Sequence, residues 1–170
     1  MKPLVIFSFL FLATFLSNAQ STQFGVTAGV IYVKGEGRFE ERVATRSETG
    51  FYAGGIVDIS ISDKFHVQPE VVLAASDEGG AMFVPIMAKY YLISGLSIQG
   101  GPQFDYTFEQ IPDNFTSLGI AAALGIGYDI SQRFFVEARY SFQLNDYYTG
   151  DLDATATVNN LLVGIGYKFN

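Results

Sequence analysis

The chain has 170 residues and carries 17 acidic against 10 basic side chains, which gives a formal net charge of −7. This length accommodates one domain, or at most two small ones. The absence of Cys excludes disulfides, Cys-ligated metals and a thiol nucleophile. The acidic balance argues against a nucleic-acid partner, because no basic stripe can form. A content of 18 Gly, 16 Phe and 10 Tyr with only 16% charged residues is typical of a β-rich chain.

The N-terminal segment has the pattern of an export signal. Lys2 precedes an uncharged apolar run over residues 4–16, which Ser17-Asn18-Ala19 follow. This pattern predicts a cleaved secretory signal peptide over residues 1–19 and a mature domain over residues 20–170. The alternative is a buried core helix or an N-terminal anchor, although the run is too short to span a bilayer well. We expect the protein to act outside the cytoplasm.

Alternation of apolar and polar residues recurs along the rest of the chain and predicts eight strands. Most of them are close to the roughly 9–11 residues that a tilted transmembrane strand needs, and a typical globular strand has only about 5–6. The expected strands are residues 24–33, 51–61, 65–74, 82–92, 96–106, 118–130, 134–144 and 160–169.

The connections between these strands alternate in length. Tight turns at residues 62–64, 93–95 and 131–133 alternate with longer segments at 34–50, 75–81, 107–117 and 145–159. Short periplasmic turns and long outer loops are typical of outer-membrane barrels. The sequence therefore predicts an all-β fold, an eight-stranded antiparallel up-and-down transmembrane β-barrel. Segment 34–50, with balanced charges, is expected to be a solvated loop or a hairpin that extends the barrel.

The two faces of the predicted strands differ in kind. One face is rich in Phe, Tyr, Ile, Leu and Val and has no charged residue along its whole length. The other face carries Gly and Ala together with all the charged strand residues. A narrow eight-stranded interior suits the second set, so we expect the apolar face to point at lipid.

Aromatic residues of the apolar face gather near the strand ends, where amphipathic rings are expected at both membrane interfaces. The predicted periplasmic girdle is Phe24, Phe65, Tyr90, Tyr128, Phe134, Tyr167 and Phe169, and the predicted outer girdle is Tyr32, Phe51, Phe104, Tyr106, Tyr140 and Phe142.

Four charged residues share the interior face: Glu70, Lys89, Glu137 and Arg139. Ionised groups in a narrow lumen must be paired or hydrated. Glu70 and Lys89 sit on neighbouring strands and can pair directly, and Glu137 and Arg139 lie about 6–7 Å apart on one face. We expect an ion-pair network that plugs the barrel; the alternative is a polar relay or gate, as charged rings form in pores.

Few residues suggest catalysis or metal binding. His66 is the only histidine, and we expect it to be a rim residue. Neighbouring Ser60 lacks an oxyanion motif, so no Ser-His-Asp arrangement is expected. Asp146, Asp151 and Asp153 could offer oxygen ligands to a hard cation, but their spacing is not that of a calcium loop. We expect neither a metal site nor a cofactor.

Several segments together resemble the PorT-like outer-membrane β-barrel family of Gram-negative bacteria. They are residues 24–30, 61–70, 84–92, 100–103, 135–141 and 164–169. The resemblance implies a fold and a location in the outer membrane, without one shared activity. The chain departs from the pattern at its end, where Asn170 follows the aromatic Phe169.

The leading functional hypothesis is a small non-enzymatic outer-membrane barrel with a packed polar lumen. Its role would be structural, adhesive or an interaction with another envelope component. Expected partners are outer-membrane lipid and, during insertion, the barrel-assembly machinery. The alternatives are a narrow pore for small solutes, a secreted soluble lipocalin-like ligand-binding barrel, and a weaker one, an outer-membrane enzyme that acts on lipids.

Overall fold

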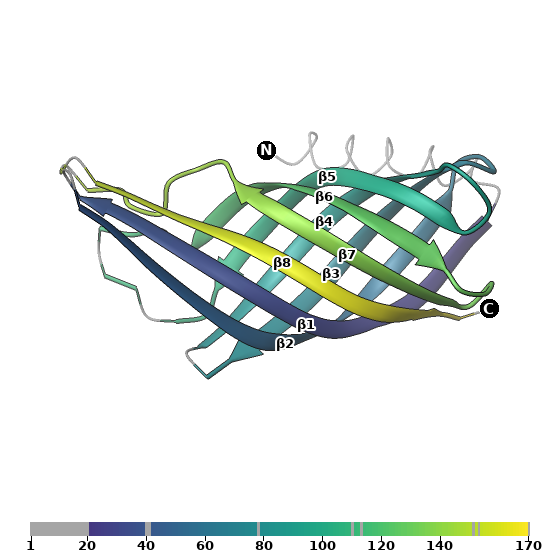
Figure 1. The fold of residues 1–170 in the computed structure, drawn as a ribbon, viewed down its shortest axis with the longest axis horizontal. Coiled ribbons are helices and arrows are strands. Elements are labelled where there is room, and N and C mark those ends of the chain that lie inside the picture. The colour runs from purple at the N-terminus through teal and green to yellow at the C-terminus, as the bar shows by residue number, and fades with distance from the viewer. Residues whose placement is uncertain are drawn as a thin grey trace, which may run out of the picture.

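The computed structural model describes residues 21–39, 42–77, 79–109, 111–112, 114–150, 152 and 154–169. Its strands are β1 (Ser21–Phe39), β2 (Arg42–Ser60), β3 (Phe65–Ser76), β4 (Gly79–Tyr91), β5 (Leu96–Thr107), β6 (Leu118–Asp129), β7 (Phe134–Gln143) and β8 (Ala154–Lys168). Each strand pairs antiparallel with the next, and β1 also pairs with β8, so the sheet closes into an up-and-down barrel (Figure 1). The fold prediction is confirmed. The predicted signal peptide and Asn170 lie outside the described residues.

Three tight connections lie together at one end of the barrel, which we call the short-turn end (Figure 1). Ser62 Oγ accepts a hydrogen bond from the backbone N–H of Phe65 at 3.1 Å, and Ser131 Oγ does the same for Phe134. At the third turn Gly95 has φ +82°, a left-handed conformation that favours glycine. These turns fix the register of the hairpins that they close. Among the described residues, no helix is long and apolar enough to cross a membrane.

The opposite end, the outer end, carries a hairpin that projects beyond the rest of the wall (Figure 1). β1 and β2 stay paired from Ser21↔Ser60 to Phe39↔Arg42, and β8 follows β1 out to Ala154. Of the two expectations for residues 34–50, the hairpin is therefore correct. The predicted strands 24–33, 51–61 and 160–169 were too short, because charged and Gly residues there resemble a loop in sequence although their backbone groups continue the ladder.

The outward face of the barrel changes from apolar to polar at one level. Along β1, exposed Phe24, Val26, Val30 and Tyr32 give way to Lys34, Glu36 and Arg38. Glu36 lies 3.0 Å from the Arg38 guanidinium and 3.9 Å from Lys34 Nζ. On β8 the same change from apolar to polar residues lies between Leu161, which pairs with Tyr32, and Thr157, which pairs with Glu36. This level marks the outer edge of the zone that suits hydrocarbon.

The predicted girdle residues lie on the outward face. All are exposed except Tyr167, which is half-buried. At the short-turn end, the Tyr167 ring contacts Phe134 and Phe169 edge-on, with centroids 4.9 and 5.6 Å apart. Towards the outer end, Tyr140 and Phe142 form a similar pair at 4.6 Å. Rings at both ends of a more aliphatic belt are what the two interfaces of a bilayer favour.

Candidate functional site in the barrel interior

An ion-pair network occupies the middle of the lumen. Arg139, on β7, reaches across the barrel to Glu70 on β3, with Nη2 2.7 Å from the Glu70 carboxylate. The same nitrogen lies 3.1 Å from Glu137, and all three side chains are at most 2% exposed. Gln99 donates a further hydrogen bond to Glu137. The structure thus brings three of the four predicted lumen residues into direct contact.

Lys89 joins this network through a neutral residue rather than directly. Its ammonium donates to Gln68 at 3.1 Å, and Gln68 in turn donates to Glu70 at 2.7 Å. The direct Glu70–Lys89 pair that neighbouring strands suggested is therefore not formed. Lys89 Nζ instead lies 5.0 Å from the centroid of the Phe135 ring, a cation–π contact inside the barrel. Gln68 has the same inward parity, but its role as a bridge has no signal in the sequence.

An apolar layer lies on the outer side of the network. Ile31, Tyr52, Val72, Phe83 and Leu162 form this cluster, each at most 5% exposed. Tyr52 borders the charged network, and Ile31 and Phe83 line the space at the barrel mouth. Two layers of buried side chains, one charged and one apolar, therefore lie across the lumen.

A second polar cluster lies at the short-turn end. Lys168 Nζ is 2.7 Å from Asp58 and 3.5 Å from Asp129, and Tyr91 donates to Asp129 at 2.9 Å. Lys168 also lies 5.5 Å from the Phe135 ring centroid, on which Lys89 lies as well. All these residues face the lumen, as their parity predicts, but only the three-dimensional register shows that they meet.

Asp58 of this cluster also takes part, with His66 and Ser60, in an arrangement that the sequence did not predict. His66 Nδ1 lies 2.7 Å from Asp58 Oδ1, and His66 Nε2 lies 2.8 Å from Ser60 Oγ. The expectation that no Ser-His-Asp arrangement exists was wrong, because β2 and β3 bring the three side chains to one rim. The missed signal is that Asp58 and Ser60 are two residues apart on the inward face of β2, opposite His66.

This trio lacks other parts of a hydrolase site. Ser60 ends strand β2 and is not on the strand–turn–helix elbow that supplies oxyanion donors in serine hydrolases. Asp58 also holds Lys168, so its carboxylate is shared. Within the described ranges, no group of three or more His, Asp or Glu side chains is arranged to hold a metal ion.

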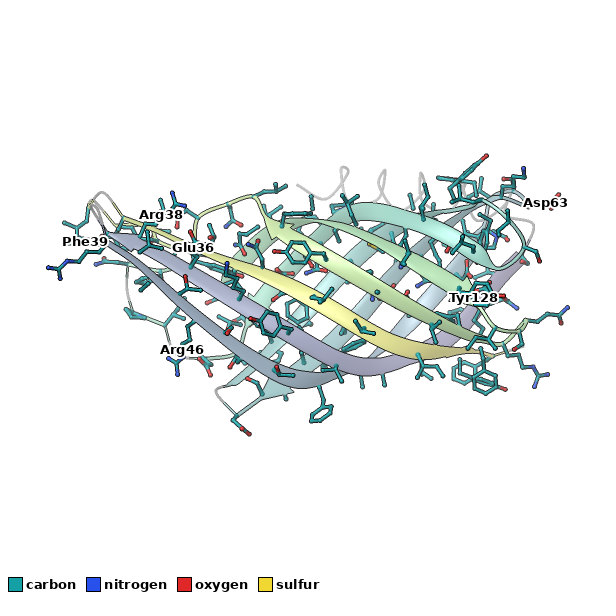
Figure 2. The ribbon with its side chains drawn as sticks, viewed as in Figure 1. Glu36, Arg38, Phe39, Arg46, Asp63 and Tyr128 are labelled. Carbon is teal, nitrogen blue, oxygen red and sulfur yellow. The ribbon has the colours of Figure 1, made fainter. Side chains whose placement is uncertain are left out.

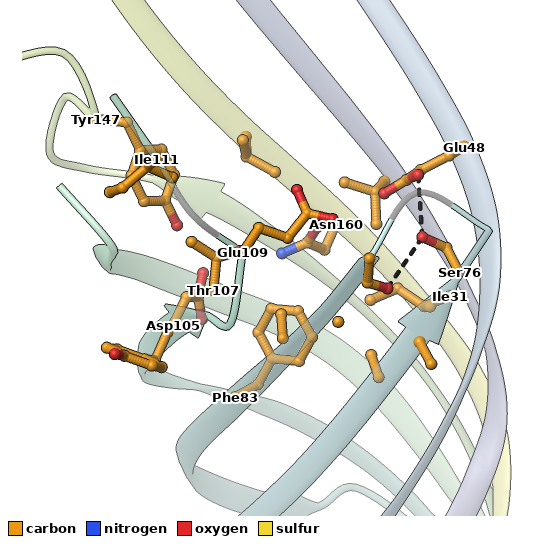
Figure 3. Close-up of a pocket in the computed structure, with 18 of the residues that line it drawn as sticks. Ile31, Glu48, Ser76, Phe83, Asp105, Thr107, Glu109, Ile111, Tyr147 and Asn160 are labelled. Atoms are coloured by element: carbon orange, nitrogen blue, oxygen red, sulfur yellow. Dashed lines mark hydrogen bonds between the residues drawn. The ribbon is translucent and has the colours of Figure 1, made fainter. Parts of the chain in front are cut away.

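The mouth of the barrel contains a cavity of about 590 Å³ (Figure 3). Its floor includes Ile31 and Phe83, and Asp105 and Tyr147 line one side. The connections after β5 and β7 enclose that side, since Thr116 donates a backbone hydrogen bond to Tyr147 O at 2.9 Å. Burial, and secondarily the charge of Asp105, raises the pKa of Tyr147 to about 12, so its hydroxyl stays protonated. Asp105 was placed on the inward face by its parity, but no sequence pattern indicated a cavity.

Comparison with known proteins identifies the fold. No family model matches the chain, and no curated protein matches it significantly. Among solved structures, Ail, the attachment invasion locus protein of Yersinia pestis, matches with a TM-score of 0.51 and 15% identity, over 88% of this chain and 100% of Ail. Neisserial surface protein A matches with a TM-score of 0.51 and 14% identity, over 88% of this chain and 100% of that one. OprG of Pseudomonas aeruginosa matches with a TM-score of 0.47 and 16% identity, over 90% and 98%.

The fold of this chain is therefore that of the small eight-stranded outer-membrane β-barrels. At this level of identity the likeness concerns the fold alone. The resemblance to the PorT-like family stays a prediction.

Proposed function

We propose that this chain is a non-enzymatic outer-membrane barrel with a closed lumen, which interacts with its surroundings through its outer end. The observation that carries the proposal is the buried contact of Arg139 with Glu70 and Glu137 across the lumen. Its partners in this proposal are outer-membrane lipid and, during insertion, the barrel-assembly machinery. The PorT-like family is the finer assignment, supported by the sequence segments that resemble it.

The location in a membrane is supported by the distribution of apolar side chains. Phe51 is 75% exposed, Leu124 59% and Phe24 62%, while charged Arg139 and Lys89 are 2% and 1% exposed. A soluble lipocalin-like barrel has the reverse arrangement, with its apolar face inward around a ligand. The exposed apolar belt therefore favours lipid as the surroundings of this barrel.

A closed lumen is favoured over a narrow pore by the packing of the interior. Gln68, Met87 and Ser141 are completely buried in the barrel. Ions need a continuous polar path, and the apolar cluster around Tyr52 and Phe83 interrupts the described interior.

Conductance in planar bilayers tests the closed state. We expect the purified protein in 1 M KCl to give no steady single-channel current. The Glu137→Ala variant, in which Arg139 loses one carboxylate, should stay closed as well, because the apolar cluster around Tyr52 and Phe83 is intact. Steady conductance of the parent protein would replace this proposal with the narrow-pore hypothesis.

The direction of insertion can be tested because the natural chain has no Cys. Thr45→Cys lies on the exposed β2 part of the projecting hairpin, and Asp63→Cys lies in an exposed turn at the short-turn end (Figure 2). On intact cells, a membrane-impermeant maleimide should label Thr45→Cys and should reach Asp63→Cys only after permeabilisation. Labelling of Asp63→Cys alone on intact cells would reverse the orientation.

A further inference from the structure

We propose that the cavity at the barrel mouth binds a small organic cation with an apolar body, such as a protonated arylalkylamine, whose charge pairs with Asp105. The proposal rests on an unpaired buried carboxylate, an unpartnered buried amide oxygen and aromatic walls around one cavity. It does not depend on the direction in which the barrel is inserted.

Asp105 is the anchor of this site. It lines the cavity and is only 4% exposed. Among the described residues, the neutral amide of Gln103 is the side chain that donates to it, at 2.9 Å, and no Lys or Arg forms an ion pair with it. A buried carboxylate normally has a cationic partner or several donors. Glu70 and Glu137 have such a partner in Arg139. The described residues give Asp105 no cationic partner, so we expect a ligand at this site to carry a positive charge.

A second polar group points to the same ligand chemistry. Asn160 lines the cavity from β8 and is 2% exposed, and its Oδ1 has no hydrogen-bond partner within the described part of the chain. A buried acceptor without a hydrogen bond lowers stability, so a ligand that donates a hydrogen bond to it is favoured. An ammonium group supplies up to three N–H donors together with its charge.

The remaining walls fit the apolar part of such a molecule. Phe83 and Phe115 line the cavity with aromatic rings, which attract cations as well as hydrocarbon. The other charged residues that line the cavity are Arg46, Glu48 and Glu109, so with Asp105 the described lining is acidic overall. Figure 3 shows Glu48, Glu109 and Asp105 around the cavity. Glu48 also accepts a hydrogen bond from Ser76 at 3.0 Å. This balance attracts cations and repels anions.

Contacts between two loops shape the cavity. Thr149 donates a backbone hydrogen bond to Asn114 O at 2.8 Å, and Phe115 and Tyr148 form an isolated β-bridge with their rings in edge contact. These contacts join the connection after β5 to the connection after β7. A preformed cavity of about 590 Å³ is within the range of small-molecule sites.

Calorimetric titration with three probes that share a phenylethyl group tests the proposal: phenethylammonium, 2-phenylethanol and 3-phenylpropanoate. The protein is kept in a maltoside detergent, because phosphocholine head groups are themselves organic cations. We expect saturable 1:1 binding of the amine, roughly tenfold or more tighter than the alcohol, and no saturable binding of the acid. Equal affinity for amine and alcohol, or no saturation by the amine, would overturn the proposal.

Variants locate the site. Asp105→Asn should reduce the affinity for the amine roughly tenfold and leave the affinity for the alcohol unchanged. Glu36→Gln, which removes a carboxylate from the outward face of β1, is the matched control and should bind as the parent does. If Asp105→Asn does not fold, Asn160→Leu tests the same cavity and should weaken the amine several-fold. Binding that the control weakens as much as the cavity variants would show only surface attraction and would overturn the assignment.

Discussion

The middle of the lumen and the mouth of the barrel treat buried carboxylates in opposite ways. In the middle, Glu70 and Glu137 share the guanidinium of Arg139, and the space around them is filled. At the mouth, Asp105 faces a cavity, and the Gln103 amide is the side-chain donor to it among the described residues. The charges in the middle are paired with one another, whereas the described residues offer Asp105 no cationic partner. Charge pairing therefore distinguishes the middle of the interior, where charged side chains stabilise the fold, from the mouth, where Asp105 can bind a ligand in our proposal.

The largest expected effect comes from removal of the central cation. Arg139→Met leaves Glu70 and Glu137 buried without their partner and should lower the free energy of unfolding by about 3–5 kcal/mol. Urea titration of the protein in lipid vesicles, followed by the gel mobility of unheated samples, measures this loss. The control is Arg133→Met, at an exposed residue in the turn between β6 and β7, and it should change the free energy of unfolding little.

The triple variant Arg139→Met, Glu70→Gln, Glu137→Gln separates charge from packing. Because it contains no unpaired charge, it should recover a large part of the lost stability. If Arg139→Met is as stable as Arg133→Met, the network is hydrated and the contrast between middle and mouth fails.

On the outer wall, the level at which apolar residues end can be tested on one strand. Ile165→Arg places a charge midway along the apolar face of β8 and should cost about 2–4 kcal/mol in a bilayer. Thr157→Arg lies on the same face beyond Leu161, opposite Glu36, and should cost about 0–1 kcal/mol. Folding yield into vesicles and urea midpoints compare the two variants. Equal penalties would mean that the membrane boundary lies elsewhere.

Most of the architecture could be predicted from the sequence because a barrel wall repeats with period two. The parity of each strand is enough to assign Arg139 and Glu70 to the lumen and Phe51 to lipid. Parity does not specify how far strands slide past each other, so the Lys89–Gln68 bridge could not be predicted. The Ser60–His66–Asp58 contact did have a signal, because Asp58 and Ser60 share the inward face of β2 opposite His66, and this signal was missed. The cavity could not be predicted from the sequence for a further reason. Hydrogen bonds between loops shape it, and such bonds leave no periodic pattern in the sequence.

The same contrast in packing can be tested with a single methyl group. A Cβ added at Gly166 would run into the Phe135 ring in the filled lumen, and one at inward-facing Gly35 would meet only a backbone oxygen at 3.8 Å. Gly166→Ala should therefore destabilise by about 1–3 kcal/mol, the usual cost of overpacking, and Gly35→Ala should not. Thermal unfolding in detergent measures both. Equal tolerance would show that the lumen is less tightly filled than described.

The Ser60–His66–Asp58 contact should behave as a structural hydrogen-bond chain. Ser60→Ala removes the bond to His66 and should cost about 0.5–1.5 kcal/mol, typical for one hydrogen bond. A fluorophosphonate probe should fail to label the parent protein, because an activated serine also needs oxyanion donors. Labelling that disappears in Ser60→Ala would instead show a nucleophile and contradict the non-enzymatic proposal.

The smallest expected effect has the opposite sign and bears most directly on the comparison. Asp105→Asn keeps an oxygen that accepts from Gln103 but removes a buried charge that has no cationic partner among the described residues. Its stability should stay unchanged or rise by up to about 1 kcal/mol, as is common when a binding residue is replaced. Glu137→Gln, the corresponding change in the middle of the lumen, should lose stability because Arg139 then keeps only one carboxylate. Both variants can be unfolded in urea in the same detergent. A loss in Asp105→Asn as large as that in Glu137→Gln would place Asp105 in the structural network after all, and the mouth would then be an extension of the plug.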